Sequence, residues 1–128
     1  MDSIHRKMED SDLFVFASPV YCGTPPAKLI SFFERSIDQK KVNLETLVIE
    51  NNKLKGKKAV VLQVNFFIDI AYQKLPSMVY DRILGEIFKM EIVGRLGVPD
   101  VNDPGDITQK KASLQEAYDL AVKICSNS

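Results

Sequence analysis

Apolar residues of this chain fall into three short runs that predict β-strands. The runs occupy residues 13–17, Lys58–Val64 and Glu91–Val98. The first run does not alternate between apolar and polar positions, so it has the pattern of a strand buried on both faces, as in a parallel sheet. The second is apolar enough to be a central strand, whereas the third carries Arg95 between two glycines, a pattern typical of an edge strand.

Between these runs, apolar residues recur at the spacing of amphipathic helices. Helices are expected at residues 25–37, 76–90 and 108–126, and residues 1–10 have the pattern of the end of another helix. The long connection at residues 38–58 predicts a further turn of helix or an extra strand within residues 42–49. The expected inward residues are Ala27, Ile30, Phe33 and Ile37 in the first helix, Val79, Ile83 and Ile87 in the second, and Leu114, Ala117, Ala121 and Ile124 or Cys125 in the last.

Strands and helices therefore alternate along the chain, which predicts one α/β domain at residues 1–128 with helices on both faces of a parallel sheet. Ligands of such sheets bind beyond the carboxyl ends of the strands. The first strand ends at Ser18 and Pro19, and Thr24 is the expected N-cap of the next helix, with Pro25 at its first position and Pro76 near the first turn of the following one. The segment from Ser18 to Thr24 is thus the first candidate site.

Charge and cysteine content narrow the possible functions. The chain has 17 basic and 17 acidic residues, which gives a net charge of zero and no electrostatic signal for nucleic acid. Cys22, Cys125 and the lone His5 lack the spacing of metal ligands, and no combination of side chains suggests a catalytic acid, base or nucleophile. There is no apolar run of membrane length or signal-peptide core, so a cytoplasmic location without membrane contact is expected.

The candidate segment resembles the flavin-contacting segment of the NAD(P)H-dependent FMN reductase family. The resemblance rests on Ser18-Pro19-Val20-Tyr21, Gly23, Pro25, Ala27, Phe32 and Arg35, preceded by Ser11-Asp12 and an apolar strand. Residues 54–58 before the second strand and 102–107 before the last helix are also similar to the family. The chain departs from the family at Ile30, where lysine is common, and at Glu34, where aspartate is common.

This resemblance implies a three-layer flavodoxin-like fold that binds FMN and takes electrons from NAD(P)H for an acceptor such as a quinone or free flavin. The implied flavin-binding residues are Ser18, Pro19, Val20, Tyr21, Cys22 and Gly23, with Asn65 and Phe66 at the end of the next strand lining the other side of the ring. A family member begins with a strand, a phosphate-binding loop, a helix and a second strand. This chain starts after them, so we expect an N-terminally truncated fold with weak or absent FMN binding.

The expected fold also predicts a partner. In the flavodoxin strand order 2-1-3-4-5, the run from Leu13 to Ala17 would pair with the first strand, which the chain lacks. Its uncharged edge would then be exposed, which proteins generally avoid. We expect another copy of the chain, a partner subunit or the missing part of the gene product to cover it.

Two other functions remain open from the sequence. The chain could be a non-enzymatic protein that has lost the flavin and acts through self-association or a protein partner. It could also bind a different planar ligand in the same crevice without redox chemistry. A yellow colour of the purified protein would distinguish the oxidoreductase from both.

Overall fold

The computed structural model describes residues 2–42, 45, 49–67 and 71–126, and its centre is a parallel sheet. The sheet consists of β1 (Leu13–Pro19), β4 (Lys58–Val64) and β5 (Glu91–Val98), in the order β1-β4-β5. Leu13 lies opposite Lys58 and Pro19 opposite Val64, so β1 and β4 end at the same level. The predicted parallel sheet is confirmed, with β4 central and β5 at an edge.

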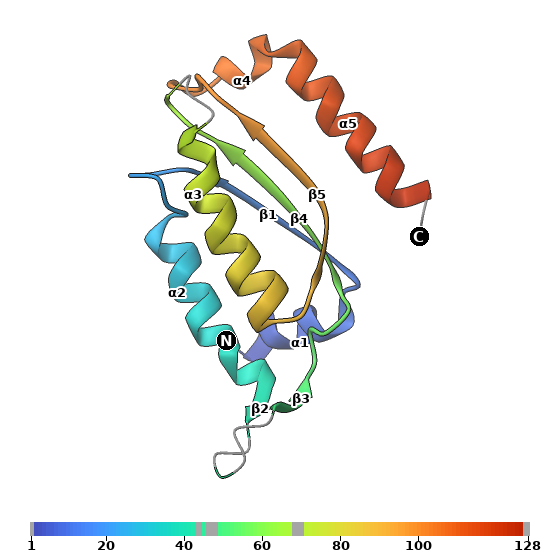
Figure 1. Ribbon diagram of the computed structural model, residues 1–128. Helices are drawn as coiled ribbons and strands as arrows, with labels where there is room; N and C mark the ends of the chain where they lie inside the picture. Colours follow the sequence, from blue (N-terminus) through green and yellow to red (C-terminus); the bar gives the residue numbers. More distant parts are fainter. Residues whose placement is uncertain (1, 43–44, 46–48, 68–70, 127–128) are drawn as a thin grey trace.

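Helices lie on both faces of this sheet, as expected (Figure 1). One face carries α1 (Asp2–Asp10), α2 (Ala27–Arg35) with a 3-10 turn at Ser36–Gln39, and α3 (Ala71–Tyr80), which continues as a π-helix at Asp81–Ile87. The opposite face carries α5 (Lys111–Ser126), which is preceded by the short α4 (Asp106–Gln109). The structure therefore has three layers.

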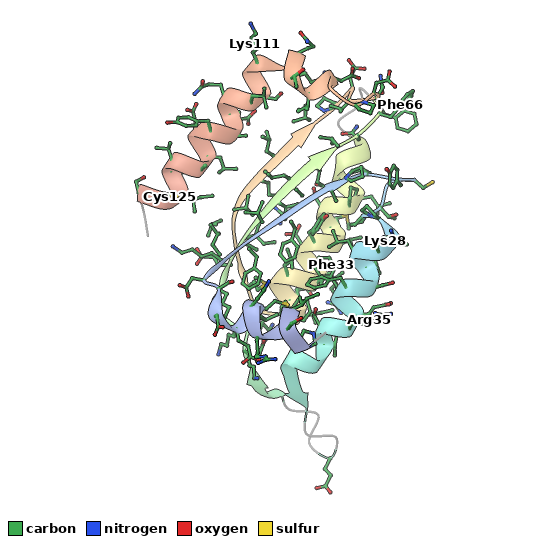
Figure 2. The ribbon with its side chains drawn as sticks, turned by 180° about the vertical axis from the view of Figure 1, so that it is seen from behind. Lys28, Phe33, Arg35, Phe66, Lys111 and Cys125 are labelled. Atoms are coloured by element: carbon green, nitrogen blue, oxygen red, sulfur yellow. The ribbon has the colours of Figure 1, made fainter. Side chains whose placement is uncertain are left out.

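Aromatic side chains fill the space between the sheet and α2 and α3. Figure 2 shows Phe33 pointing from α2 toward the sheet, and its ring lies 5.3 Å from that of Phe16, 6.2 Å from that of Tyr80 and 6.4 Å from that of Phe88. Leu84 completes the buried centre of this cluster. This core fixes the position of β1 relative to α3. It therefore also fixes where the loops at the carboxyl ends of β1 and β4 lie.

The turn of helix or extra strand expected within residues 42–49 falls mostly outside the described residues, and a two-stranded antiparallel sheet flanks that stretch. β2 (Lys40–Val42) pairs with β3 (Ile49–Asn52), and residues 43–44 and 46–48 between them lie outside the described residues. After β3, the Lys57 ammonium donates to the carbonyl oxygens of Glu9 and Ser11, both at 2.6 Å. This lysine therefore holds the end of α1 against the start of β4.

Two predicted helix starts are wrong. Pro25 is not helical: α2 begins at Ala27, because a residue followed by a proline is disfavoured in the helical conformation and Pro26 follows Pro25. The Thr24 hydroxyl donates to the Tyr21 carbonyl oxygen at 3.0 Å and does not cap the helix. Pro76 lies buried inside α3, which starts at Ala71 and not near Pro76.

Several residues expected to face inward are exposed. Ile37 follows the end of α2 in a 3-10 turn, which changes the angular spacing of side chains and leaves Ile37 at the surface. In α5, Ala117 and Ile124 lie on the sheet side, as expected. Leu114, Ala121 and Cys125 also line the apolar hollows between α5 and the sheet, but they remain exposed. Among the helices of the described residues, none is both long and apolar enough to cross a membrane.

Candidate functional site

The loops after β1 and β4 meet at the carboxyl edge of the sheet, where the site was expected. The Val20 amide donates to the Val64 carbonyl oxygen at 2.8 Å, so the chain after β1 stays beside β4 for one residue beyond the strand. The two predicted segments, Ser18 to Gly23 and Asn65 with Phe66, therefore follow neighbouring strands and lie close together.

The segment after β1 forms a tight two-residue turn. Tyr21 and Thr24 exchange backbone hydrogen bonds of 3.0 and 2.9 Å, and Cys22 and Gly23 between them have φ angles of +50° and +74°. Two successive positive φ angles define a type I′ turn, in which glycine is favoured at the second position. No group in the described chain bonds the backbone N–H of Cys22 or Gly23, so both can donate to a ligand.

Three exposed aromatic rings lie on the two loops that follow β1 and β4. Tyr21 is 62% exposed, Phe66 64% and Phe67 47%. The rings of Phe66 and Phe67 meet edge to face with centroids 5.4 Å apart, and Figure 2 shows Phe66 at the carboxyl end of the strands. Because large exposed rings at strand ends are available to stack on a planar ligand, Phe67 joins the predicted Tyr21 and Phe66 as a candidate contact.

Asn65 holds the shape of the second loop. Its backbone N–H donates to the Val98 carbonyl oxygen at 3.1 Å, and its backbone carbonyl oxygen accepts from the Val101 N–H at 3.0 Å. Its side-chain nitrogen donates to the Phe67 carbonyl oxygen at 2.5 Å. The side chain is buried. Asn65 therefore positions Phe66 and Phe67 from within the loop.

A buried polar pair, which the sequence did not reveal, lies beneath the first loop. The hydroxyl groups of Ser18 and Tyr80 are 2.8 Å apart, and Tyr80 is fully buried. Burial raises the pKa of Tyr80, and the hydrogen bond with Ser18 acts in the opposite direction. Gln63, the sheet neighbour of Ser18, is also buried and accepts from the Ser77 hydroxyl at 3.4 Å. These contacts fasten the ends of β1 and β4 to α3.

The loop after β5 is already occupied by a carboxylate of the chain. Asp106 accepts from the backbone amides of Asn102 and Asp103, both at 2.9 Å. These two hydrogen bonds lower the pKa of Asp106. A negative side chain at this position makes the loop a poor site for a phosphate.

An apolar cavity of about 400 Å³ lies between the sheet and α5, below the strand ends. Its lining includes Ala17, Pro19, Leu62, Leu96 and Leu114. Among the described residues, no group of three acidic, histidine or cysteine side chains is placed to hold a metal ion.

Comparison with known proteins agrees with this geometry. A model of NADPH-dependent FMN reductases matches residues 1–66, which is more than half of the 128 residues. The chain belongs to the NADPH-dependent FMN reductase family. It is also 30% identical over 130 residues to an iron-sulfur flavoprotein of Methanosarcina thermophila, covering 98% of this chain and 60% of that protein. The chain therefore spans about three fifths of the length of this curated relative.

Solved structures of low sequence identity show the same flavodoxin-like fold. The Trp repressor binding protein of Bacillus subtilis has a TM-score of 0.75 at 21% identity, with 93% of this chain and 68% of that chain covered. An FMN-dependent NADH-azoreductase of Bacillus anthracis, solved with FMN, has a TM-score of 0.67 at 17% identity, with 96% and 60% covered. The predicted fold class is thus confirmed.

The site fits the ring of FMN better than its phosphate. The aromatic rings of Tyr21, Phe66 and Phe67 suit a flat isoalloxazine, and the free amides of Cys22 and Gly23 suit its polar edge. A phosphate would need several N–H or hydroxyl donors, but Pro25 and Pro26 remove two amides just before α2. The described residues at this edge of the sheet therefore offer more contacts to a flavin ring than to a phosphate.

Proposed function

We propose that this chain forms the isoalloxazine-binding part of an FMN-dependent NAD(P)H oxidoreductase. The observation that carries the proposal is the presence of three exposed aromatic rings and two unbonded backbone amides on the neighbouring loops after β1 and β4. Membership of the reductase family supports the cofactor and the electron donor. The acceptor in this proposal is a small oxidant such as a quinone or free flavin.

The protein's role in the proposed reaction is to position the reactants. FMN, when bound, supplies the redox chemistry between NAD(P)H and the acceptor. Tyr21 and Phe66 would stack on the ring, and the amides of Cys22 and Gly23 would donate to its polar edge. The Ser18–Tyr80 hydrogen bond fastens the end of β1 to α3, and Asn65 holds the loop after β4 in shape.

Substitution of Tyr21 tests the site directly. Because Tyr21 is 62% exposed, Tyr21→Ala should leave folding unchanged but weaken riboflavin binding about 5- to 10-fold, which corresponds to roughly 1 kcal/mol of lost ring packing. Quenching of flavin fluorescence during titration measures the affinity. NAD(P)H oxidation by the flavin-loaded protein should fall in parallel at subsaturating flavin.

Tyr118→Ala is the matched control, because Tyr118 is 65% exposed but lies on α5, away from the strand ends. It should leave flavin binding unchanged. If both variants bind flavin as the unmodified protein does, or if the unmodified protein does not quench flavin fluorescence at all, the proposed ring site is wrong.

A further inference from the structure

One edge of the sheet has no neighbour among the residues that the structure describes. β1 pairs with β4 on one side, and no described strand lies on its other side (Figure 1). The edge is accessible, since the side chains of Leu13, Val15 and Ala17 are all exposed and Val15 is 57% exposed. Such an edge is a template for another strand.

The hydrogen bonds to β4 show which backbone groups remain free. Asp12 accepts from the Lys58 amide at 2.9 Å, and Val20 donates to Val64 at 2.8 Å, so even-numbered residues turn their backbone toward β4. Alternate residues of a strand turn their backbone groups to opposite sides. Leu13, Val15 and Ala17 therefore direct both N–H and C=O to the open edge, and Pro19 directs only C=O because it has no N–H.

We propose that a second copy of this chain pairs its β1 antiparallel to this edge, around a two-fold axis at Val15. In that register Val15 lies opposite Val15 of the second copy, and Leu13 lies opposite Ala17 in two symmetric pairs. Each pair joins residues with two free backbone groups, so each forms two hydrogen bonds. The ladder ends beside Pro19, which cannot donate to a further bond.

The side chains are compatible with the same register on both faces of the sheet. On the α5 face, the large Leu13 meets the small Ala17, and the two Val15 side chains meet at the axis. On the other face, Phe14 lies opposite Phe16, an aromatic cross-strand pair that stabilises antiparallel sheets. β1 has no charged residue to oppose the approach, and the chain has zero net charge. A two-fold contact covers both edges with one interface and leaves no further edge open.

The first test is the mass of the unmodified 128-residue chain in sedimentation equilibrium at about 50 μM. We expect a dimer, and Val15→Lys should weaken the association at least about tenfold, because two lysines would face each other at the axis. Val122→Lys is the control: Val122 is 49% exposed on α5 and off the edge, so this variant should remain a dimer. A monomer at this concentration, or a Val15→Lys variant that is folded by circular dichroism and dimerises normally, would overturn the proposal.

Cysteine cross-linking tests the register in a chain whose exposed Cys22 and Cys125 are replaced by serine. The two Val15 Cα atoms should be about 5.5 Å apart, within the roughly 4.4–6.8 Å that a disulfide spans. Val15→Cys should therefore form covalent dimers under mild oxidation. Ala17→Cys alone should not, since its two copies would be roughly 13 Å apart along the strands, but it should cross-link when mixed with Leu13→Cys. Equal cross-linking of Val15→Cys and Ala17→Cys alone would contradict this register.

Discussion

At the scale of single residues, Tyr80 shows how a buried polar group is tolerated beneath the candidate site. The ring packs edge-on against Phe33, with an interplanar angle of 87°, while the hydroxyl group is buried and bonds that of Ser18. A buried hydroxyl without a partner costs about 1–3 kcal/mol, so this hydrogen bond decides whether the end of β1 can lie against α3. Tyr80 thus connects the core with the loop that carries Tyr21.

Tyr80→Phe should lower the free energy of unfolding by about 0.5–1.5 kcal/mol at neutral pH, since it leaves Ser18 without its bond. The stabilisation depends on pH. Because burial raises the pKa of Tyr80 above its ordinary value of 10.0, the neutral form is favoured in the folded protein, and its contribution is complete below pH 10 and lost as the pH rises through the raised pKa.

Absorbance of phenolate at 295 nm should show a late titration step in the unmodified protein that is missing in Tyr80→Phe. Tyr118→Phe should keep the stability of the unmodified protein, because Tyr118 is exposed. A late step that persists in Tyr80→Phe, or no late step in the unmodified protein, would refute this account.

At the scale of elements, one glycine sets the distance between α5 and the sheet. A Cβ atom at Gly94 of β5 would lie 2.8 Å from the Cδ1 atom of Leu120 and 3.2 Å from its Cδ2 atom. Leu120 is one of the residues by which α5 faces the sheet. The absence of a side chain at Gly94 therefore allows the helix to approach β5 closely.

Gly94→Ala should destabilise the protein by about 1–3 kcal/mol, because Leu120 must leave its position. The double variant Gly94→Ala, Leu120→Ala should lose less free energy of unfolding than the two single variants lose together, since the smaller side chain leaves space for the new methyl group. Urea unfolding measures all three variants. Gly85→Ala is the control, because a Cβ atom there meets nothing within 4 Å. Additive effects of Gly94→Ala and Leu120→Ala would argue against direct contact between the two positions.

At the scale of the whole molecule, the ring site and the phosphate site differ in completeness. The ring site is built by two loops from adjacent strands, and both are fixed by hydrogen bonds. No loop of the described residues is equally suited to bind the phosphate. Two prolines without N–H groups precede α2, and the loop after β5 already contains the Asp106 carboxylate. The flavin affinity of this chain should therefore come from the ring alone.

This chain should bind FMN and riboflavin with affinities within about tenfold of each other. A phosphate held by three or four charge-assisted hydrogen bonds at roughly 1.5 kcal/mol each would separate them by on the order of 5 kcal/mol, or a few thousandfold. Parallel fluorescence titrations at 50 and 300 mM salt give the affinities for FMN and riboflavin and the dependence of each on salt concentration. FMN binding that is much tighter than riboflavin binding would reveal a phosphate site within the chain.

The sequence by itself determined the three strands of the parallel sheet and thus where the candidate site lies. Lys58–Val64 and Glu91–Val98 were predicted with the observed ends, because a buried strand needs a continuous apolar run that polar or turn-forming residues terminate. The loop at Asn65 follows the predicted end of β4, whereas β1 continues to Pro19, beyond the predicted run 13–17, before the turn at Tyr21 to Thr24.

Only the tertiary structure decided which side chains meet. Ser18 and Tyr80 are 62 residues apart, and no local pattern marks them as partners. Pro76 has local features of a helix start, yet packing of α3 on the core keeps it within the helix. The apolar residues of α5 form a band wider than the surface it packs on, so periodicity alone could not tell that Ile124 is buried while Leu114 and Cys125 stay exposed beside the sheet. Local propensity and spacing determine elements, whereas contacts between distant residues depend on how the finished elements pack.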